Sequence, residues 1–154
     1  MPKLLPFTLA AYLVGISFPS YTQPEPEMSP IQRSTTQDDP ELPPHDLSDI
    51  LDAQYGFILF SIDGCPACTR AYPRFTALEQ EAEAACISQD ALDFDSVNLT
   101  HERPEPAEFI GKDIQYVPTV IEIQNGRERQ WYVGAGEDFT RLEVRVRSMI
   151  EAYR

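Results

Sequence analysis

The chain has few cysteines and few basic residues, and each shortage excludes a class of protein. Three cysteines in 154 residues are too few for a small domain held together by disulfides, so the fold must rest on a hydrophobic core. Lys and Arg number 12 against 25 Asp and Glu, which gives a formal net charge of −13. Because so acidic a surface repels phosphate backbones, nucleic acid is excluded as the main partner.

The length and the apolar content indicate one folded domain. A chain of 154 residues fills one core of ordinary size and is too short for two. The apolar fraction of 42% is ordinary for a folded domain and too high for a chain that is disordered throughout. We therefore expect a single folded domain, and we expect the protein to be a monomer.

The prolines divide the chain, because nine of the fourteen lie in the first 44 residues. Proline fixes φ and removes a backbone donor, so we expect neither regular sheet nor a long helix there. Within residues 1–23, Lys3 is followed by an uncharged, mostly apolar run from Leu4 to Phe18. This pattern is typical of a secretory signal peptide. A retained membrane anchor is the alternative, which Pro6 and Pro19 disfavour, as does the shortness of the run.

Residues 24–44 are rich in Pro, Glu, Ser, Thr, Gln and Asp and have almost no apolar residues. Such a composition cannot offset its ordering entropy by burial, and it predicts a flexible linker. The folded domain then covers residues 45–154. With a signal peptide the protein is periplasmic or secreted; with a retained N-terminal segment it is anchored to the membrane, facing outside the cytosol.

Apolar periodicity in residues 45–154 predicts alternating helices and strands followed by a hairpin. The hairpin turns at Asn125-Gly126, a pair that favours positive φ. The pattern predicts a mixed α/β sheet with helices on both faces. The predicted helices are Asp46–Gln54, Cys65–Ala85, Glu105–Gly111 and Thr140–Tyr153, and the predicted strands are Phe57–Ile62, Phe94–Leu99, Val117–Gln124 and Gln130–Val133.

Cys65-Pro66-Ala67-Cys68 stands where a buried strand leads into a helix. Cys65 at the helix N-terminus has free backbone N–H groups and the helix dipole to stabilise a thiolate. Pro66 suits the first turn, since its missing N–H has no intrahelical partner there. Cys68 lies one turn further in, and we expect it to be more buried. This asymmetry predicts Cys65 as the attacking sulfur and Cys68 as the resolving one.

Half of a zinc site is the other interpretation of two cysteines at this spacing. Only Cys86, His45 and His101 remain to complete four ligands, and none of them has paired ligand spacing. We therefore favour a redox pair over a zinc-binding module and predict no metal site.

The domain resembles a thioredoxin, and the match extends beyond the two cysteines. Pro73 corresponds to the proline that kinks the active-site helix of that family, and Val117-Pro118-Thr119 resembles its cis-proline segment. Asn125-Gly126 and Gly134 also follow Pro118 at the family's offsets. The resemblance implies a three-layer thioredoxin-like fold. It also implies that Pro118 faces the disulfide and blocks metal binding to it. Tyr116 and Val117, beside Pro118, are candidates for lining a substrate groove, and a place in the core is the alternative for apolar residues beside a strand.

The sequence departs from the family pattern in three features. Gly64 stands where a tryptophan usually precedes the first cysteine, and Leu59 replaces a buried acid that helps deprotonate the resolving thiol. The dipeptide Pro66-Ala67 is closer to that of glutaredoxins, although the spacing from Pro118 to Gly134 fits thioredoxins. Because the acid is absent, fast thioredoxin-like disulfide reduction is in doubt.

The resulting hypothesis is an exported thiol–disulfide oxidoreductase, with a lean toward a reductase or isomerase. It acts on protein thiols and disulfides, its only cofactor is its own Cys65–Cys68 disulfide, and an unidentified partner recycles it. A thioredoxin-fold binding module that recruits a client without redox turnover is the alternative.

Several other residues are expected to have no role in the chemistry. Asp63 is interpreted as an exposed loop acid, and His101 as a loop histidine without a partner. We expect Cys86 to be a buried, inert thiol. The remaining candidates, which we interpret as a solvated helix face, are Arg141, Arg145 and Arg147.

Overall fold

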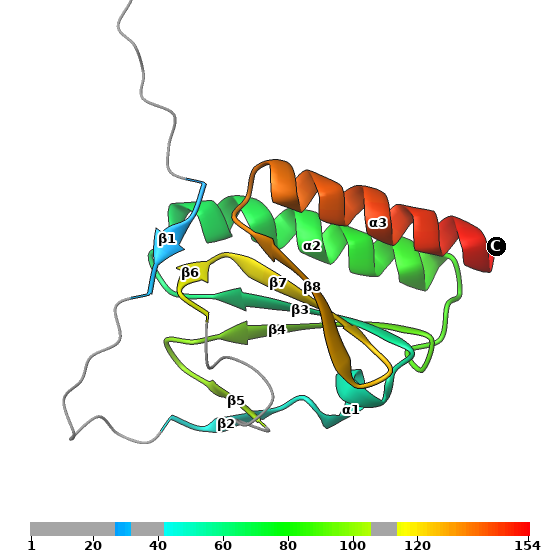
Figure 1. Ribbon diagram of the computed structural model, residues 1–154, viewed down its shortest axis with the longest axis horizontal. Helices are drawn as coiled ribbons and strands as arrows, with labels where there is room; N and C mark the ends of the chain where they lie inside the picture. The colour runs from blue at the N-terminus through cyan, green and yellow to red at the C-terminus, as the bar shows by residue number, and fades with distance from the viewer. Residues whose placement is uncertain (1–26, 32–41, 106–113) are drawn as a thin grey trace, which may run out of the picture.

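The structure is a computed structural model that describes residues 27–31, 42–105 and 114–154 (Figure 1). Its centre is a four-stranded sheet in the order β4-β3-β7-β8. The central strand β3 (Tyr55–Ser61) pairs in parallel with β4 (Leu92–Asn98) and antiparallel with β7 (Thr119–Gln124). The hairpin partner of β7 is β8 (Arg127–Val133). The predicted mixed sheet is therefore confirmed.

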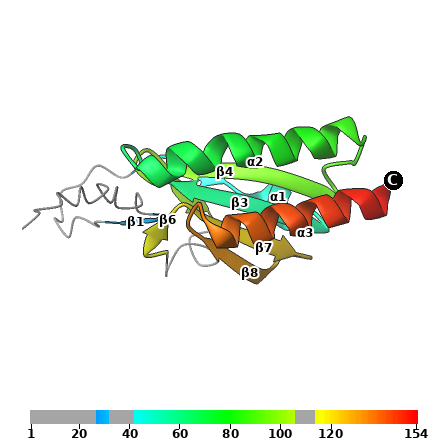
Figure 2. The same ribbon diagram turned by 90° about the horizontal axis from the view of Figure 1, so that it is seen from above.

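The two long helices lie on the same face of this sheet. Helices α2 (Pro66–Ala84) and α3 (Glu137–Tyr153) run side by side, as Figures 1 and 2 show. Phe57 of β3 points to this face, where it stacks on Phe94 of β4. Phe75 of α2 meets the same Phe94 ring edge-on. These aromatic rings, together with the aliphatic side chains around them, form the core between helices and sheet.

The short helix α1 (Ser48–Asp52) packs on the opposite face. Side chains alternate along a strand, so Gly56 and Ile58 of β3 face away from the α2 side. A Cβ on Gly56 would lie 2.8 Å from the carbonyl oxygen of Ile50, so α1 approaches the strand at this glycine. Helices thus cover both faces, as predicted, although α1 is shorter than the predicted helix over Asp46–Gln54.

Two small two-stranded sheets flank the central one. Strand β1 (Ser29–Pro30) pairs antiparallel with β6 (Tyr116–Val117). Strand β2 (Pro44–Asp46) pairs in parallel with β5 (Arg103–Glu105). Both β1 and the start of β2 fall where the proline content predicted no sheet, so that expectation is wrong at these positions.

Two predicted segments fall outside the described residues. The signal peptide or anchor over 1–23 is one of them. Of the predicted helix over 105–111, residues 106–111 are also outside, and Glu105 ends strand β5. Among the described residues, no helix is long and apolar enough to span a membrane.

His45 connects the start of the domain to the sheet. Its Nε2 lies 2.9 Å from Asp95 Oδ2, and its Nδ1 lies 3.1 Å from Glu102 Oε2. Burial lowers the pKa of His45, but the hydrogen bond and charge of Asp95, with those of Glu102, raise it above the usual 6.5. The imidazole thus contacts two carboxylates, and its protonated form bridges them and holds β2 against β4.

We expect His45 to make stability depend on pH. A folded-state pKa above the unfolded value of 6.5 gives stability that is present below that pH and is lost as pH rises through the folded pKa. His45→Gln should therefore cost about 0.5–1 kcal/mol at acid pH, since the partners are partly exposed. Urea unfolding of the wild type and of His45→Gln, at pH values below and above 6.5, measures the difference in unfolding free energy. A difference that stays constant with pH would contradict the bridge.

Candidate functional site

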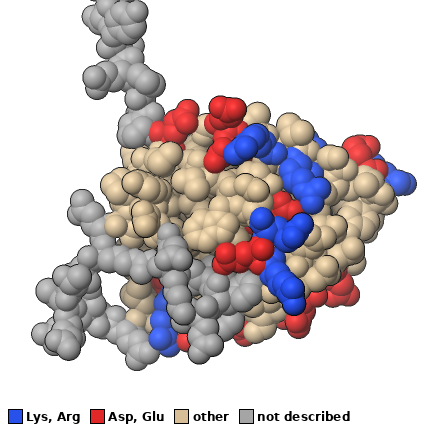
Figure 3. All heavy atoms as spheres, in the orientation of Figure 1, with Lys and Arg blue, Asp and Glu red and all other residues tan. Residues whose placement is uncertain are grey.

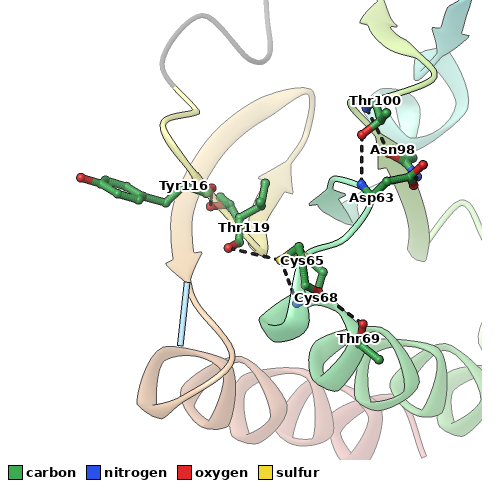
Figure 4. Close-up of a disulfide and its surroundings, with 9 residues drawn as sticks. Asp63, Cys65, Cys68, Thr69, Asn98, Thr100, Tyr116 and Thr119 are labelled. Carbon is green, nitrogen blue, oxygen red and sulfur yellow. Dashed lines mark hydrogen bonds between the residues drawn. A yellow bond between two sulfur atoms is a disulfide. The ribbon is translucent and has the colours of Figure 1, made fainter. Parts of the chain in front are cut away.

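Cys65 and Cys68 form a disulfide at the N-terminus of α2 (Figure 4). Cys65 is the N-cap residue and Pro66 follows in the first turn. The backbone N–H of Cys68 donates to Cys65 Sγ at 3.0 Å. Free N–H groups at a helix start stabilise negative charge, so this place favours a thiolate on Cys65 once the disulfide opens.

Both cysteines are buried to a similar degree. Cys65 is 3% exposed and Cys68 is 6% exposed, so the expectation that Cys68 is the more buried of the two is wrong. The segment before Pro118 covers Cys65, whose Sγ lies 3.9 Å from the carbonyl oxygen of Val117 (Figure 4). In the sequence, the burial of each cysteine can be inferred only from its position along α2. That position does not indicate that the segment before Pro118 covers Cys65.

The segment Tyr116–Thr119 lies directly against the disulfide. The Val117–Pro118 peptide bond is cis. Gly134 N–H donates to Pro118 O at 2.7 Å, and the Thr119 hydroxyl donates to Tyr116 O at 2.7 Å. Val117 is fully buried and belongs to the core, whereas Tyr116 is 44% exposed beside the site. Of the two residues predicted to line a substrate groove, Tyr116 is the one with an exposed side chain.

An open hollow of about 360 Å³ lies on the disulfide. Its lining includes both cysteines, the loop residues Asp63 and Gly64, and Tyr72 and Pro73 of α2. Pro73 lies inside α2, where the resemblance places the helix proline. Gly64 has φ +69 and no neighbouring atoms where a Cβ would stand. The hollow therefore opens beside the buried disulfide on this side, where another molecule can approach it.

Asp63 and His101 form a pair at the rim of this hollow. His101 Nε2 lies 2.7 Å from Asp63 Oδ2, so the expectation of a histidine without a partner is wrong. Asn98 Nδ2 also donates to Asp63. The hydrogen bond from Asn98, with a smaller effect of the one from His101, lowers the pKa of the Asp63 carboxyl. Asp63 is exposed, as expected. Its carboxylate points toward Asn98, away from the sulfurs, and its backbone N–H donates to Thr100 Oγ1 at 2.9 Å (Figure 4).

The sequence carried a signal for this pair. Asp63 follows the end of β3 and His101 follows the end of β4. Since β3 and β4 are parallel neighbours, their carboxyl ends lie at the same edge of the sheet. When each residue is considered only within its own loop, nothing predicts that Asp63 and His101 meet.

Leu59 occupies the position at which the resemblance implies a buried acid. Its side chain is 1% exposed within the core, on the face of the sheet that α2 covers. Position 59 is therefore as buried as a thioredoxin acid would require, and it contributes no proton acceptor.

Cys86 is exposed, so the expectation of a buried thiol is wrong. The helix α2 ends at Ala84, and Cys86 has φ +56, a left-handed conformation that closes a helix end. Its N–H donates to Glu83 O at 2.8 Å, and that of Ile87 donates to Ala82 O at 3.3 Å. The apolar run continued in the sequence after the helix had turned away from the core.

The zinc interpretation needs ligands that the fold holds apart. Cys86 is at the opposite end of the 19-residue helix α2 from Cys65, roughly 30 Å away at 1.5 Å per residue. His45 and His101 are each held by carboxylates. Within the described part of the chain, no group of three or more His, Cys, Asp or Glu could hold a metal ion.

The arginines of α3 are more than a solvated face. Arg145 binds Glu122, a carboxylate of β7 that is 4% exposed, at 3.0 Å. Arg147 binds Glu81 of α2, and Arg141 binds Asp138. Figure 3 shows arginine side chains gathered on this face of an otherwise acidic protein. The expectation of a purely solvated face is thus wrong for Arg145, because the sequence did not indicate that Glu122 is buried beneath it.

Comparison with known proteins finds similarity in fold alone. No protein-family model matches the chain, and no curated protein matches its sequence. A thioredoxin from Malassezia sympodialis is 20% identical, covers 66% of this chain and 80% of its own, and gives a TM-score of 0.50. Two structures of human ERp44, one a zinc-bound form, are 18% and 17% identical with TM-scores of 0.51 and 0.54.

These ERp44 matches cover 71% and 73% of this chain but only 31% and 30% of ERp44, so the chain spans less than a third of that protein. The similarity agrees with the mixed sheet, the helix that starts at a Cys-x-x-Cys pair and the cis-proline segment facing it. The described residues of this chain therefore form a thioredoxin-like domain.

Proposed function

We propose that the domain catalyses thiol–disulfide exchange with protein substrates through Cys65 and Cys68. The observation that carries the proposal is their disulfide at the start of α2, which lies on an open hollow and faces the Val117 carbonyl. A thioredoxin-like fold agrees with this chemistry. The substrate class is a protein disulfide or dithiol.

The exchange takes place in two displacements, starting from the reduced pair. The Cys65 thiolate attacks one sulfur of a substrate disulfide, and that disulfide breaks as the other substrate sulfur leaves and takes a proton. Cys68 then attacks Cys65 Sγ, which releases the first substrate sulfur and forms the Cys65–Cys68 disulfide. Two electrons pass from the protein to the substrate. The reverse sequence oxidises a dithiol.

The direction of exchange is proposed from the residues between the cysteines. Pro66 and Ala67 supply neither charge nor imidazole to stabilise a thiolate strongly, which favours a reductant or an isomerase over a strong oxidant. We also propose export from the cytosol, supported by the apolar run after Lys3. Outside the cytosol a separate redox partner must return the pair to its reduced form.

A binding module without redox turnover is the second candidate, and Leu59 favours it. The core holds an apolar side chain where a proton acceptor for the resolving thiol would stand. In this case the disulfide would stabilise the conformation of the site, and the hollow would bind a client protein.

Insulin reduction separates the two candidates. With dithiothreitol as electron source, the wild type should accelerate insulin precipitation, and Cys65→Ser should return the rate to the uncatalysed background, because no attacking sulfur remains. Cys86→Ser should retain wild-type activity, since Cys86 lies at the far end of α2. Equal rates for the wild type and Cys65→Ser would remove the proposal and leave the binding module.

A further inference from the structure

A strand from the chain's own proline-rich segment pairs with the edge of the site. Ser29 lies opposite Val117, and Pro30 lies opposite Tyr116, in an antiparallel pair (Figure 1). The backbone N–H of Ile31 donates to Gln115 O at 2.9 Å. Among the described residues, β6 has no other strand partner. The edge next to Pro118 is therefore occupied.

Pro30 fits this strand because of its register. The bond from Ile31 to Gln115 makes their pair a hydrogen-bonded one. Hydrogen-bonded and non-hydrogen-bonded pairs alternate along an antiparallel ladder, so Pro30 stands opposite Tyr116 in a non-hydrogen-bonded pair. Its missing N–H then costs no ladder bond. A proline-rich segment can thus supply a strand at this one register.

Glu27 fixes the other end of the same segment. Its carbonyl oxygen accepts a hydrogen bond from Ala135 N–H at 2.8 Å. Gly134 has φ +90, and a Cβ there would lie 3.0 Å from Glu27 O. A Cβ on Gly136, the N-cap residue of α3, would collide with the Glu27 carboxylate. The domain surface is therefore shaped to receive residues 27–31.

We propose that residues 27–31 are an internal pseudosubstrate strand that regulates access to the disulfide, an inference that rests on the proposed exchange activity. Ser29 is the cross-strand neighbour of Val117, whose carbonyl oxygen lies 3.9 Å from Cys65 Sγ. An extended substrate that replaced β1 in this register would therefore place one of its own residues where Ser29 stands, next to the backbone that contacts Cys65. A serine hydroxyl has the shape of a cysteine side chain but cannot form a disulfide.

The strand competes with substrate because it is covalently attached. An extended peptide that pairs with β6 must first displace β1. Only the fraction of molecules with β1 released binds such a peptide, which weakens the apparent affinity by that fraction. The substrates best able to compete are extended segments that add side-chain contacts with exposed Tyr116 and Tyr72.

Ser29→Cys tests where the strand lies and needs no substrate. In the oxidised protein the introduced thiolate should attack Cys65 Sγ, so that a new disulfide joins position 29 to Cys65, the Cys65–Cys68 bond breaks and Cys68 leaves as a thiol. Peptide mapping under acid conditions should find this isomer in the monomer. Pro30→Cys is the matched control, because neighbouring side chains of a strand point to opposite faces. Absence of the isomer in Ser29→Cys, or equal amounts in both variants, overturns the proposal.

Ile31→Pro tests regulation by removing the N–H that donates to Gln115 O. The substrate is an extended peptide that contains a disulfide. For the variant, kcat/KM should rise roughly two- to tenfold, because the strand loses the free energy of one hydrogen bond. The rise should come from a lower KM, and kcat should stay unchanged. Ile31→Val keeps the N–H and should match the wild type. Unchanged KM in Ile31→Pro overturns the regulation.

The two proposals fail in distinguishable ways. If insulin reduction is absent from the wild type, the exchange activity is lost and the regulation with it, even where the disulfide isomer of Ser29→Cys forms. If the wild type reduces insulin and that isomer does not form, only the pseudosubstrate strand is overturned.

Discussion

Replacing Cys68 with serine should stop turnover and leave substrate proteins covalently attached to the chain. Cys65 keeps its place at the start of α2 and can still open a substrate disulfide. The second displacement needs a sulfur within bonding distance of Cys65 Sγ, and Cys68 is the residue whose sulfur is bonded to it. Without it the mixed disulfide persists. With no dithiothreitol present to open the mixed disulfide, insulin reduction by the reduced variant should stop at the covalent complex, and no turnover should follow, as in Cys65→Ser.

The covalent complexes can be isolated from an extract of proteins with accessible disulfides. Cys68→Ser should yield bands of higher mass on non-reducing gels that disappear with dithiothreitol. The double variant Cys65→Ser/Cys68→Ser is the control and should yield none. Wild-type turnover by Cys68→Ser would contradict the assignment of Cys68 as the resolving sulfur.

Arg145→Met should destabilise the fold more than any other arginine substitution on α3. Arg145 Nη2 and Nε lie 3.0 and 3.3 Å from Glu122 Oε1, and the Tyr132 hydroxyl donates to Glu122 Oε2 at 2.9 Å. Burial, followed by the hydrogen bond to Glu122, raises the pKa of Tyr132 far above its usual value, so the phenol stays protonated as a donor. Without Arg145 the buried carboxylate keeps the Tyr132 hydroxyl as a donor and loses the guanidinium that binds it directly.

The expected cost is about 2–3 kcal/mol of unfolding free energy, below the full value for a buried pair because the Arg145 side chain is 44% exposed. Arg147→Met is the matched control on the same helix. Its partner Glu81 is 40% exposed, so we expect less than about 1 kcal/mol. Adding Glu122→Gln to Arg145→Met should recover part of the loss. Equal costs for the two arginine variants in urea unfolding would contradict this account.

The elements around the cysteines could be predicted because local signals agreed. The apolar run of β3, the proline after Cys65 and the helical spacing after it all indicated a strand leading into a helix, as found. Asn125-Gly126 predicted the hairpin turn, and both residues have positive φ. In these places the local chemistry and the tertiary environment favour the same structure.

The errors arose where contacts from distant segments decide the outcome. His101 is paired because β3 and β4 are neighbours, which spacing within one loop does not indicate. Cys86 is exposed because α2 ends at Ala84 and the chain turns away at Cys86, which has positive φ. Strand β1 exists because β6 offers an edge to a segment whose composition predicts no structure.

The central claim is that Cys65 is the sulfur that joins to substrate, and the complex trapped by Cys68→Ser tests it most directly. Proteolysis of that complex without reduction, followed by mass spectrometry, identifies the peptide of this chain that carries the substrate cysteine. The account predicts the peptide containing Cys65. Attachment through the exposed Cys86, or no attachment at all, would contradict it.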